Sequence, residues 1–213
     1  SGLGGYAAIY YGGAVDARII AVSPVFPALP SPKQKNIASP ILFHEKLNNA
    51  PKSSQRPAII YDPMLLSGKE VVDKMIIPAY PKSRTLELPF SGYRSHKALA
   101  AAGYLTSVID ALLFYDELID IKLPTEDSAI WHAEKGSSLK MSDPVRAICH
   151  FKRSLDISPS RQSVSALLAL FIKEGDLSEA QRLIDQANLS GDPHFILVPA
   201  TQAAALKAGL CIG

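Results

Sequence analysis

Cysteine and excess charge of one sign are both scarce in this sequence. Only two of the 213 residues are cysteines, Cys149 and Cys211, and neither has a histidine or cysteine companion at metal-ligand spacing. Two cysteines exclude the disulfide framework of a small secreted domain and predict a reducing compartment, for which we expect the cytoplasm. Lys and Arg number 22 against 20 Asp and Glu, a net charge of +2. This balance argues against nucleic acid or an anionic membrane surface as a partner.

Long apolar runs are missing as well. The most apolar stretch, residues 107–115, is interrupted by Asp110 and followed by Asp116. It falls short of the ~18 to 20 apolar residues that span a bilayer, so we expect no membrane segment. The first residues, SGLGGY, have neither a basic start nor a long apolar run and predict no signal peptide. With 47% hydrophobic residues, the chain has enough apolar material for one sizeable core and a small second unit.

Residues 1–120 alternate between helical and strand-like patterns. Short β-branched or apolar runs predict strands, and apolar positions at helical spacing predict helices between and after them. A proline-rich loop with one short helix near 41–47 is expected over 23–57, and Gly103 is a candidate break in the last helical stretch. The expected strands are 18–23, 57–62 and 84–89, and the expected helices are 6–11, 68–77 and 95–118. This order predicts an α/β unit with a parallel sheet.

The C-terminal part of the chain is expected to be all helical. Charges, Pro124, Gly136 and paired serines predict an irregular linker over 121–142, followed by a helical region over 143–213. A weak repeat with an offset of 33 residues relates two sets of positions there: Ala147, Phe151, Ser154, Leu155 and Pro159, then Ala180, Ile184 and Ala187. With a turn at Gly175-Asp176, residues 143–193 resemble a tetratricopeptide-type helical hairpin. The resemblance implies a surface for a protein partner, and the alternative is any antiparallel helix pair packed on the first domain.

The start of the chain resembles the strand-turn-helix elbow of the α/β-hydrolase fold. The run SGLGGYAAIYYGGAVDARIIAVSP supplies a glycine-rich turn, a small-residue helix and a strand in the family's order, with Asp62 after the next strand and His96 after the last. The resemblance covers about residues 1–118 and implies part of a hydrolase-like parallel sheet. Because the family's sheet normally has about five strands before the elbow, we expect this sequence to be a fragment of a longer protein.

The resemblance implies a serine esterase or acyl-transfer hydrolase acting on a small ester or acyl substrate. Ser1 would be the nucleophile, His96 the general base and Asp62 the group that orients the imidazole. The nucleophile is uncertain in position, because the glycine expected two residues after Ser1 is Leu3, and counting back from Gly4 places the nucleophile at Gly2. Either the turn holds one extra residue and Ser1 acts, or the fold is kept and the nucleophile is lost.

Two further interpretations stay open. The chain could be a non-catalytic interaction module, with the helical part as the binding surface and the α/β part as a platform. The spacing Gly2-x-Gly4-x-x-Ala7 also fits a dinucleotide fingerprint, but no strand precedes it and Ser23 stands where an acidic ribose ligand is needed. We therefore expect no cofactor and no metal. The remaining histidines are isolated in the sequence and are expected on the surface or in the core: His44, His132, His150 and His194.

Overall fold

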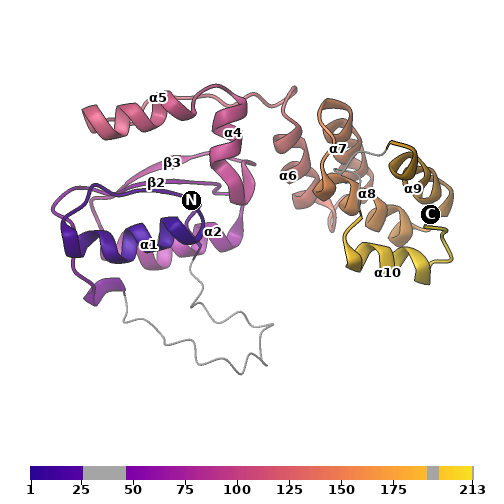
Figure 1. Cartoon of the computed structure of the whole chain (residues 1–213), viewed down its shortest axis with the longest axis horizontal. Helices are drawn as coiled ribbons and strands as arrows, with labels where there is room; N and C mark the ends of the chain where they lie inside the picture. Colours follow the sequence, from indigo (N-terminus) through magenta and orange to yellow (C-terminus); the bar gives the residue numbers. More distant parts are fainter. Residues whose placement is uncertain (26–46, 191–196, 213) are drawn as a thin grey trace. The chain divides into compact units, whose positions relative to one another are not determined.

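The chain forms two compact units, Ser1–Leu123 and Pro124–Gly213 (Figure 1). We describe a computed structural model of the 213 residues, and the description covers residues 1–25, 47–190 and 197–212. The short helix expected near 41–47 lies mostly outside the described residues, where Leu47 alone begins a 3-10 turn. Each unit has its own hydrophobic core, so each is considered by itself.

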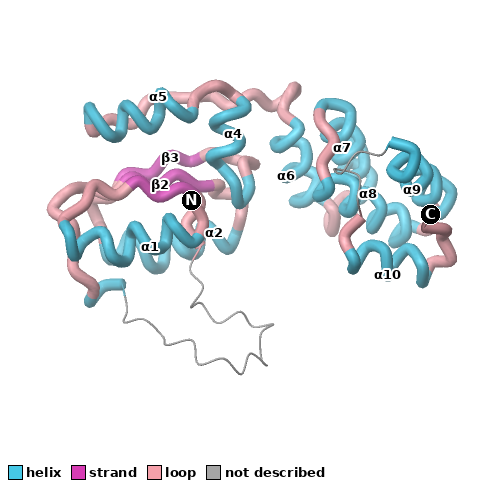
Figure 2. The backbone as a smooth tube through the Cα atoms, in the orientation of Figure 1, coloured by secondary structure: helices cyan, strands magenta, loops and turns pink. Residues whose placement is uncertain are grey.

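The first unit is built on a three-stranded parallel sheet with the order β1-β2-β3 (Figure 2). The strands are β1 (Ile20–Val22), β2 (Ala58–Tyr61) and β3 (Arg84–Glu87). Ile20 pairs with Ala58, and Ile59 pairs with Thr85. The parallel sheet predicted from the three apolar runs is confirmed, with each strand ending one to two residues before its predicted end.

Helices cover both faces of this sheet. On one face lie α1 (Leu3–Tyr11), α2 (Leu66–Val71), the π-helical turn η3 (Val72–Ile76) and α3 (Ile77–Ala79); on the other lie α4 (Ser95–Ala101), α5 (Leu105–Asp110) and the π-helical turn η5 (Ala111–Tyr115). Three short 3-10 turns join them: η1 (Gly12–Val15), η2 (Leu47–Asn49) and η4 (Gly92–Arg94). The break predicted at Gly103 is confirmed, because Gly103 adopts a φ of 77° between α4 and α5.

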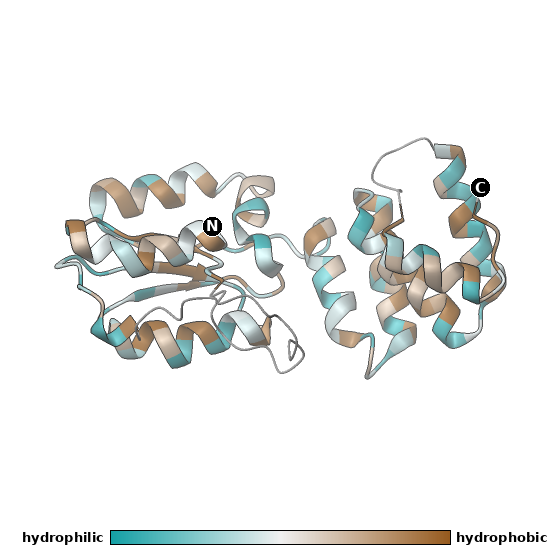
Figure 3. Ribbon diagram, turned by 60° about the horizontal axis from the view of Figure 1, so that its bottom comes forward, coloured by the Kyte–Doolittle hydropathy of each residue, from teal (hydrophilic) through white to brown (hydrophobic). Residues whose placement is uncertain are grey.

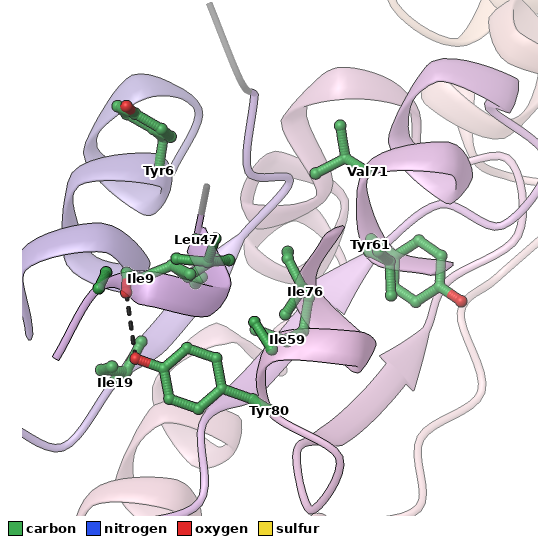
Figure 4. Close-up of a cluster of buried hydrophobic side chains, with 13 residues drawn as sticks. Tyr6, Ile9, Ile19, Leu47, Ile59, Tyr61, Val71, Ile76 and Tyr80 are labelled. Atoms are coloured by element: carbon green, nitrogen blue, oxygen red, sulfur yellow. Dashed lines mark hydrogen bonds between the residues drawn. The ribbon is translucent and has the colours of Figure 1, made fainter. Parts of the chain in front are cut away.

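Successive strand residues point to opposite faces and so fill two different cores. Ile59 and Tyr61 pack with the side chains of α1 and η3, whereas Ile60 packs with α4 and α5. β1 (Ile20–Val22) and β2 (Ala58–Tyr61) are apolar along their length, whereas β3 (Arg84–Glu87) is mostly polar. Figure 3 shows brown, hydrophobic strand segments inside the first unit. Figure 4 shows the core that Ile59 and Tyr61 form with α1 and η3. In this core the hydroxyl of Tyr80 donates a hydrogen bond of 3.3 Å to the carbonyl of Ile9.

The second unit is entirely helical in its described residues. It contains α6 (Ala129–Leu139), α7 (Pro144–Ile157), α8 (Arg161–Glu174), α9 (Leu177–Ser190) and α10 (Pro199–Lys207). Four side chains cap helix starts: Ser128 on α6, Asp143 on α7, Ser160 on α8 and Asp176 on α9. Gly175 ends α8 in the left-handed region with a φ of 79°, which confirms the turn predicted between α8 and α9.

The segment 121–142 differs from the irregular linker that the sequence suggested. Residues 129–139 form α6, and the boundary between the units falls after Leu123. Gly136 lies inside this helix and does not break it. It stands where α6 packs against α7. A Cβ at Gly136 would lie 3.1 Å from Cζ of Phe151 and 3.2 Å from the carbonyl oxygen of Ala147. Glycine therefore permits close helix packing here and does not mark a loop.

Within the described ranges, no single helix combines the length and apolar character that a membrane crossing needs. The bent pair Gly92–Ala101 and Leu105–Tyr115 passes this test of length and composition only when its two helices are taken together.

Candidate functional site

The candidate site lies at the carboxyl edge of the sheet, where the three parallel strands end. Ser23 follows β1, Asp62 follows β2, and Gly92 lies in the loop after β3. The N-terminal turn reaches the same edge, because the N–H of Gly2 donates a hydrogen bond of 3.1 Å to the carbonyl of Val22. The convergence of the turn with the ends of β1 and β2, expected from the sequence, is therefore present.

Gly2 is the strained residue of the N-terminal turn. It stands immediately before α1 with a φ of 59° and a ψ of −125°, a conformation that residues with a Cβ rarely adopt. A Cβ placed on Gly2 would meet no atom within 4 Å. The backbone turns sharply into α1 at Gly2, and the residue at this turn carries no side chain. Ser1 precedes that apex and is exposed.

Asp62 is buried, with an exposed fraction of 3%, and backbone groups use both of its oxygens. Oδ1 accepts hydrogen bonds from the N–H groups of Met64, at 2.8 Å, and Phe90, at 3.1 Å. Oδ2 accepts one from the N–H of Gly92, at 2.8 Å. Within the part of the chain that the structure describes, none of the hydrogen bonds to Asp62 comes from His96. Asp62 thus joins the loop after β3 to the end of β2.

His96 lies at the start of α4 and is half-buried. Its Nδ1 atom is buried and has no hydrogen-bond partner among the described residues. Burial lowers the pKa of His96 below its ordinary value, and the positive charges of the Ser1 amino group, Lys97 and Arg94 lower it further. The imidazole is therefore neutral at pH 7, as a general base must be.

Three buried serines form a chain of hydrogen bonds behind this edge. The hydroxyl of Ser23 donates to Oγ of Ser95 at 2.9 Å, and Oγ of Ser95 lies 2.8 Å from Oγ of Ser91. Ser23 adopts a φ of 44°, an uncommon value for a residue with a Cβ. Sequence reasoning missed these serines, because single serines after strands carry no pattern of their own. They satisfy one another's polar groups and fix the loops around the site.

Exposed apolar side chains surround the same edge. They come from the start of α1, the residue after Pro24, the loop after β2, the start of α2 and η4: Leu3, Val25, Met64, Leu66 and Tyr93. The hydroxyl of Tyr93 lies 3.2 Å from Oγ of Ser67, which connects η4 to α2. Buried polar side chains and exposed apolar side chains at one edge would suit a small ligand that has one polar group on an apolar body.

The dinucleotide interpretation receives no added support at this edge. The position where it needs an acid is held by Ser23, whose hydroxyl is occupied by Ser95. No group of three or more His, Cys, Asp or Glu side chains could hold a metal ion among the described residues.

Two histidines of the helical unit, expected to be isolated, lie against each other. Nδ1 of His132 on α6 is 2.9 Å from Nδ1 of His150 on α7, and both rings pack edge-on against Trp131. Nε2 of His132 also lies 3.2 Å from the carbonyl oxygen of Glu126. Sequence reasoning missed the pair because it placed His132 in a linker.

The histidine pair makes the helical unit sensitive to acid. Burial lowers the pKa of His150, and the charges of His132, Lys135 and Arg146 lower it further. In the unfolded chain its pKa returns to about 6.5, so below that pH the unfolded state binds more protons than the folded state. We expect the urea midpoint, followed by fluorescence of Trp131, to fall between pH 7.5 and pH 5.5. The double variant His132→Asn, His150→Asn should lose most of this pH dependence; an equal fall in both proteins would contradict the assignment.

Comparisons with known proteins found no relative. No protein-family model, no curated protein and no solved structure matches this chain.

Proposed function

We propose that residues 1–123 are an α/β-hydrolase-like unit that binds a small ester or acyl compound at the carboxyl edge of its sheet without cleaving it. The observation that carries the proposal is the geometry of Gly2, which has an uncommon positive φ immediately before α1 and open space where its Cβ would lie. A nucleophile elbow needs that conformation, and a glycine at its apex leaves no hydroxyl to attack the substrate.

The surroundings support binding more than catalysis. The start of α1 has no side-chain cap, so its first N–H groups are suited to receive a carbonyl oxygen. The apolar rim suits an acyl chain. The carboxylate of Asp62, which a hydrolase would need to orient the imidazole, is taken up by three backbone N–H groups. An unoriented imidazole is a weak general base.

An active serine esterase is the second candidate, with Ser1 as nucleophile and His96 as base. It is favoured by one observation, the buried Nδ1 of His96, which has no hydrogen-bond partner among the described residues and is therefore available as a base. Hydrolysis of p-nitrophenyl butyrate separates the candidates. Our proposal predicts the same background rate for the unmodified protein, Ser1→Ala and His96→Ala, whereas an esterase would lose about 10²-fold or more of its turnover in each variant.

Binding is tested with a compound that cannot be hydrolysed easily. We expect butyramide to give a saturation-transfer signal in ligand-observed NMR, and Met64→Asp to weaken its affinity at least about fivefold, because Met64 contributes apolar surface to the rim. Met141→Asp is the matched control, since Met141 is also exposed, at 77% against 56% for Met64, but belongs to the helical unit. Equal effects of the two substitutions, or no signal at all, would refute the acyl site.

The helical unit is the part of the chain that we propose to bind a protein partner. Its consecutive helices are amphipathic and joined by short turns, the arrangement that stacked helical hairpins use to present a binding surface.

A further inference from the structure

The helical unit carries a groove of about 960 Å³ formed by α7, α8 and α9. Leu167 and Phe171 of α8 form its buried floor. The remaining lining is supplied by α7 and the residues after it and by α9, with both apolar and charged side chains: Lys152, Leu155, Asp156, Pro159, Glu179, Arg182, Leu183, Asp185, Gln186, Leu189 and Ser190. Leu189 is 88% exposed, an unusual position for a leucine at the edge of a groove.

An ion pair closes one end of this groove. Nζ of Lys152 on α7 lies 3.2 Å from Oε2 of Glu179 on α9, and it also stands 5.4 Å from the ring centre of Phe171. Arg182 pairs with the same carboxylate, so the charges at this end are satisfied within the unit. These two cations lower the pKa of Glu179, which keeps it ionised.

Two carboxylates further along the groove have no such partner. Asp156 and Asp185 are exposed, and neither forms an ion pair with any residue that the structure describes. Asp185 accepts one hydrogen bond, of 2.8 Å, from the amide of Gln181. The open part of the groove therefore combines apolar side chains, Leu155, Leu183 and Leu189, with two free negative charges on its flanks.

We propose that this groove binds an amphipathic helix of a partner protein whose apolar face is flanked by Lys or Arg. Leucine-sized side chains at i, i+3 and i+4 would lie on the floor between α7 and α9. The basic residues would pair with Asp156 and Asp185. This charge complementarity requires the partner helix to carry positive charge beside its apolar face. The inference deepens the proposed role of the helical unit, and it is independent of the acyl site.

The test uses two labelled amphipathic peptides of about 15 residues, long enough to form a helix on the surface. One contains only Leu and Lys, and the other contains only Leu and Glu at the same positions. Fluorescence anisotropy with the full chain should show binding of the Leu/Lys peptide, at least about tenfold weaker binding of the Leu/Glu peptide, and a loss of affinity as salt rises.

Variants locate the binding to the groove. The double variant Asp156→Asn, Asp185→Asn should lower the affinity for the Leu/Lys peptide about fivefold. Leu189→Asp should lower this affinity at least as much. Asp73→Asn and Glu174→Gln together remove two exposed carboxylates outside the groove and should leave the affinity unchanged.

Three results would overturn the proposal: equal affinity for both peptides, equal effects of the groove and control variants, or self-association of the chain that Leu189→Asp abolishes, which would assign the groove to a second copy. Because butyramide binding is measured at the other unit, a failure here leaves the acyl site untouched, and the reverse also holds.

Discussion

Asp62→Ala is expected to lower the free energy of unfolding of the first unit by about 3 to 5 kcal/mol. The carboxylate accepts three backbone hydrogen bonds, and its removal leaves the buried N–H of Gly92 and the part-buried N–H groups of Met64 and Phe90 without an acceptor. Phe90 adopts a φ of 60°, which is unfavourable for a residue with a Cβ, so the bonds to Asp62 hold a strained backbone in this loop. Urea unfolding followed by far-UV circular dichroism measures the loss.

The matched control for Asp62→Ala is Asp73→Ala. Asp73 is exposed and pairs with Lys69 one turn away on the same helical stretch, so its loss should cost no more than about 0.5 kcal/mol.

Asp62→Asn adds a sharper test. It keeps an acceptor for two N–H groups and places an amide donor against the N–H of Gly92, so we expect an intermediate loss of stability and faster amide exchange at Gly92. A stable Asp62→Asn protein with unchanged exchange would show that the carboxylate is free for another role.

Phe151→Ala should cost the helical unit about 3 to 5 kcal/mol, the range for removing a buried aromatic side chain. Phe151 is fully buried, and its ring fills the space left by Gly136 where α6 meets α7. Trp131 is the single tryptophan of the chain and lies on α6. Its fluorescence during urea unfolding therefore reports on this unit.

Leu189→Ala is the control for Phe151→Ala. With 88% of Leu189 exposed, its truncation should change the unfolding free energy by less than about 0.5 kcal/mol. A loss below about 1 kcal/mol for Phe151→Ala would mean that α6 and α7 do not form the packed pair described here.

The sheet was predictable because its signals are local. Each strand is a short β-branched or apolar run, such as PAIIYD, bounded by polar or turn-forming residues, and the helical pattern between the last two strands requires parallel neighbours. Parallel strands bring their carboxyl ends to one edge, so the position of Asp62 after β2, at the same edge as the end of β1 to which Gly2 is bonded, also followed from chain order. The turn after α8 followed from Gly175, whose left-handed conformation is one that glycine adopts readily.

The three backbone hydrogen bonds that Asp62 accepts could not be predicted from the sequence. They depend on positive φ angles at Phe90 and Gly92, and no rule of residue type places a phenylalanine there. The pair of His132 and His150 was missed for a different reason. Gly136 and its neighbouring serines look like a loop in the sequence, and only the close approach of Phe151 shows why a glycine is needed inside α6.

The absence of a nucleophile at the elbow is the central claim, and covalent labelling tests it most directly. The unmodified protein is incubated with a fluorophosphonate, which reacts with activated serines, and its intact mass is measured by mass spectrometry. Our account predicts no adduct, because Gly2 occupies the apex of the turn and Asp62 is held by backbone N–H groups. A stoichiometric adduct on Ser1 that disappears in His96→Ala would contradict it and make the chain a serine hydrolase.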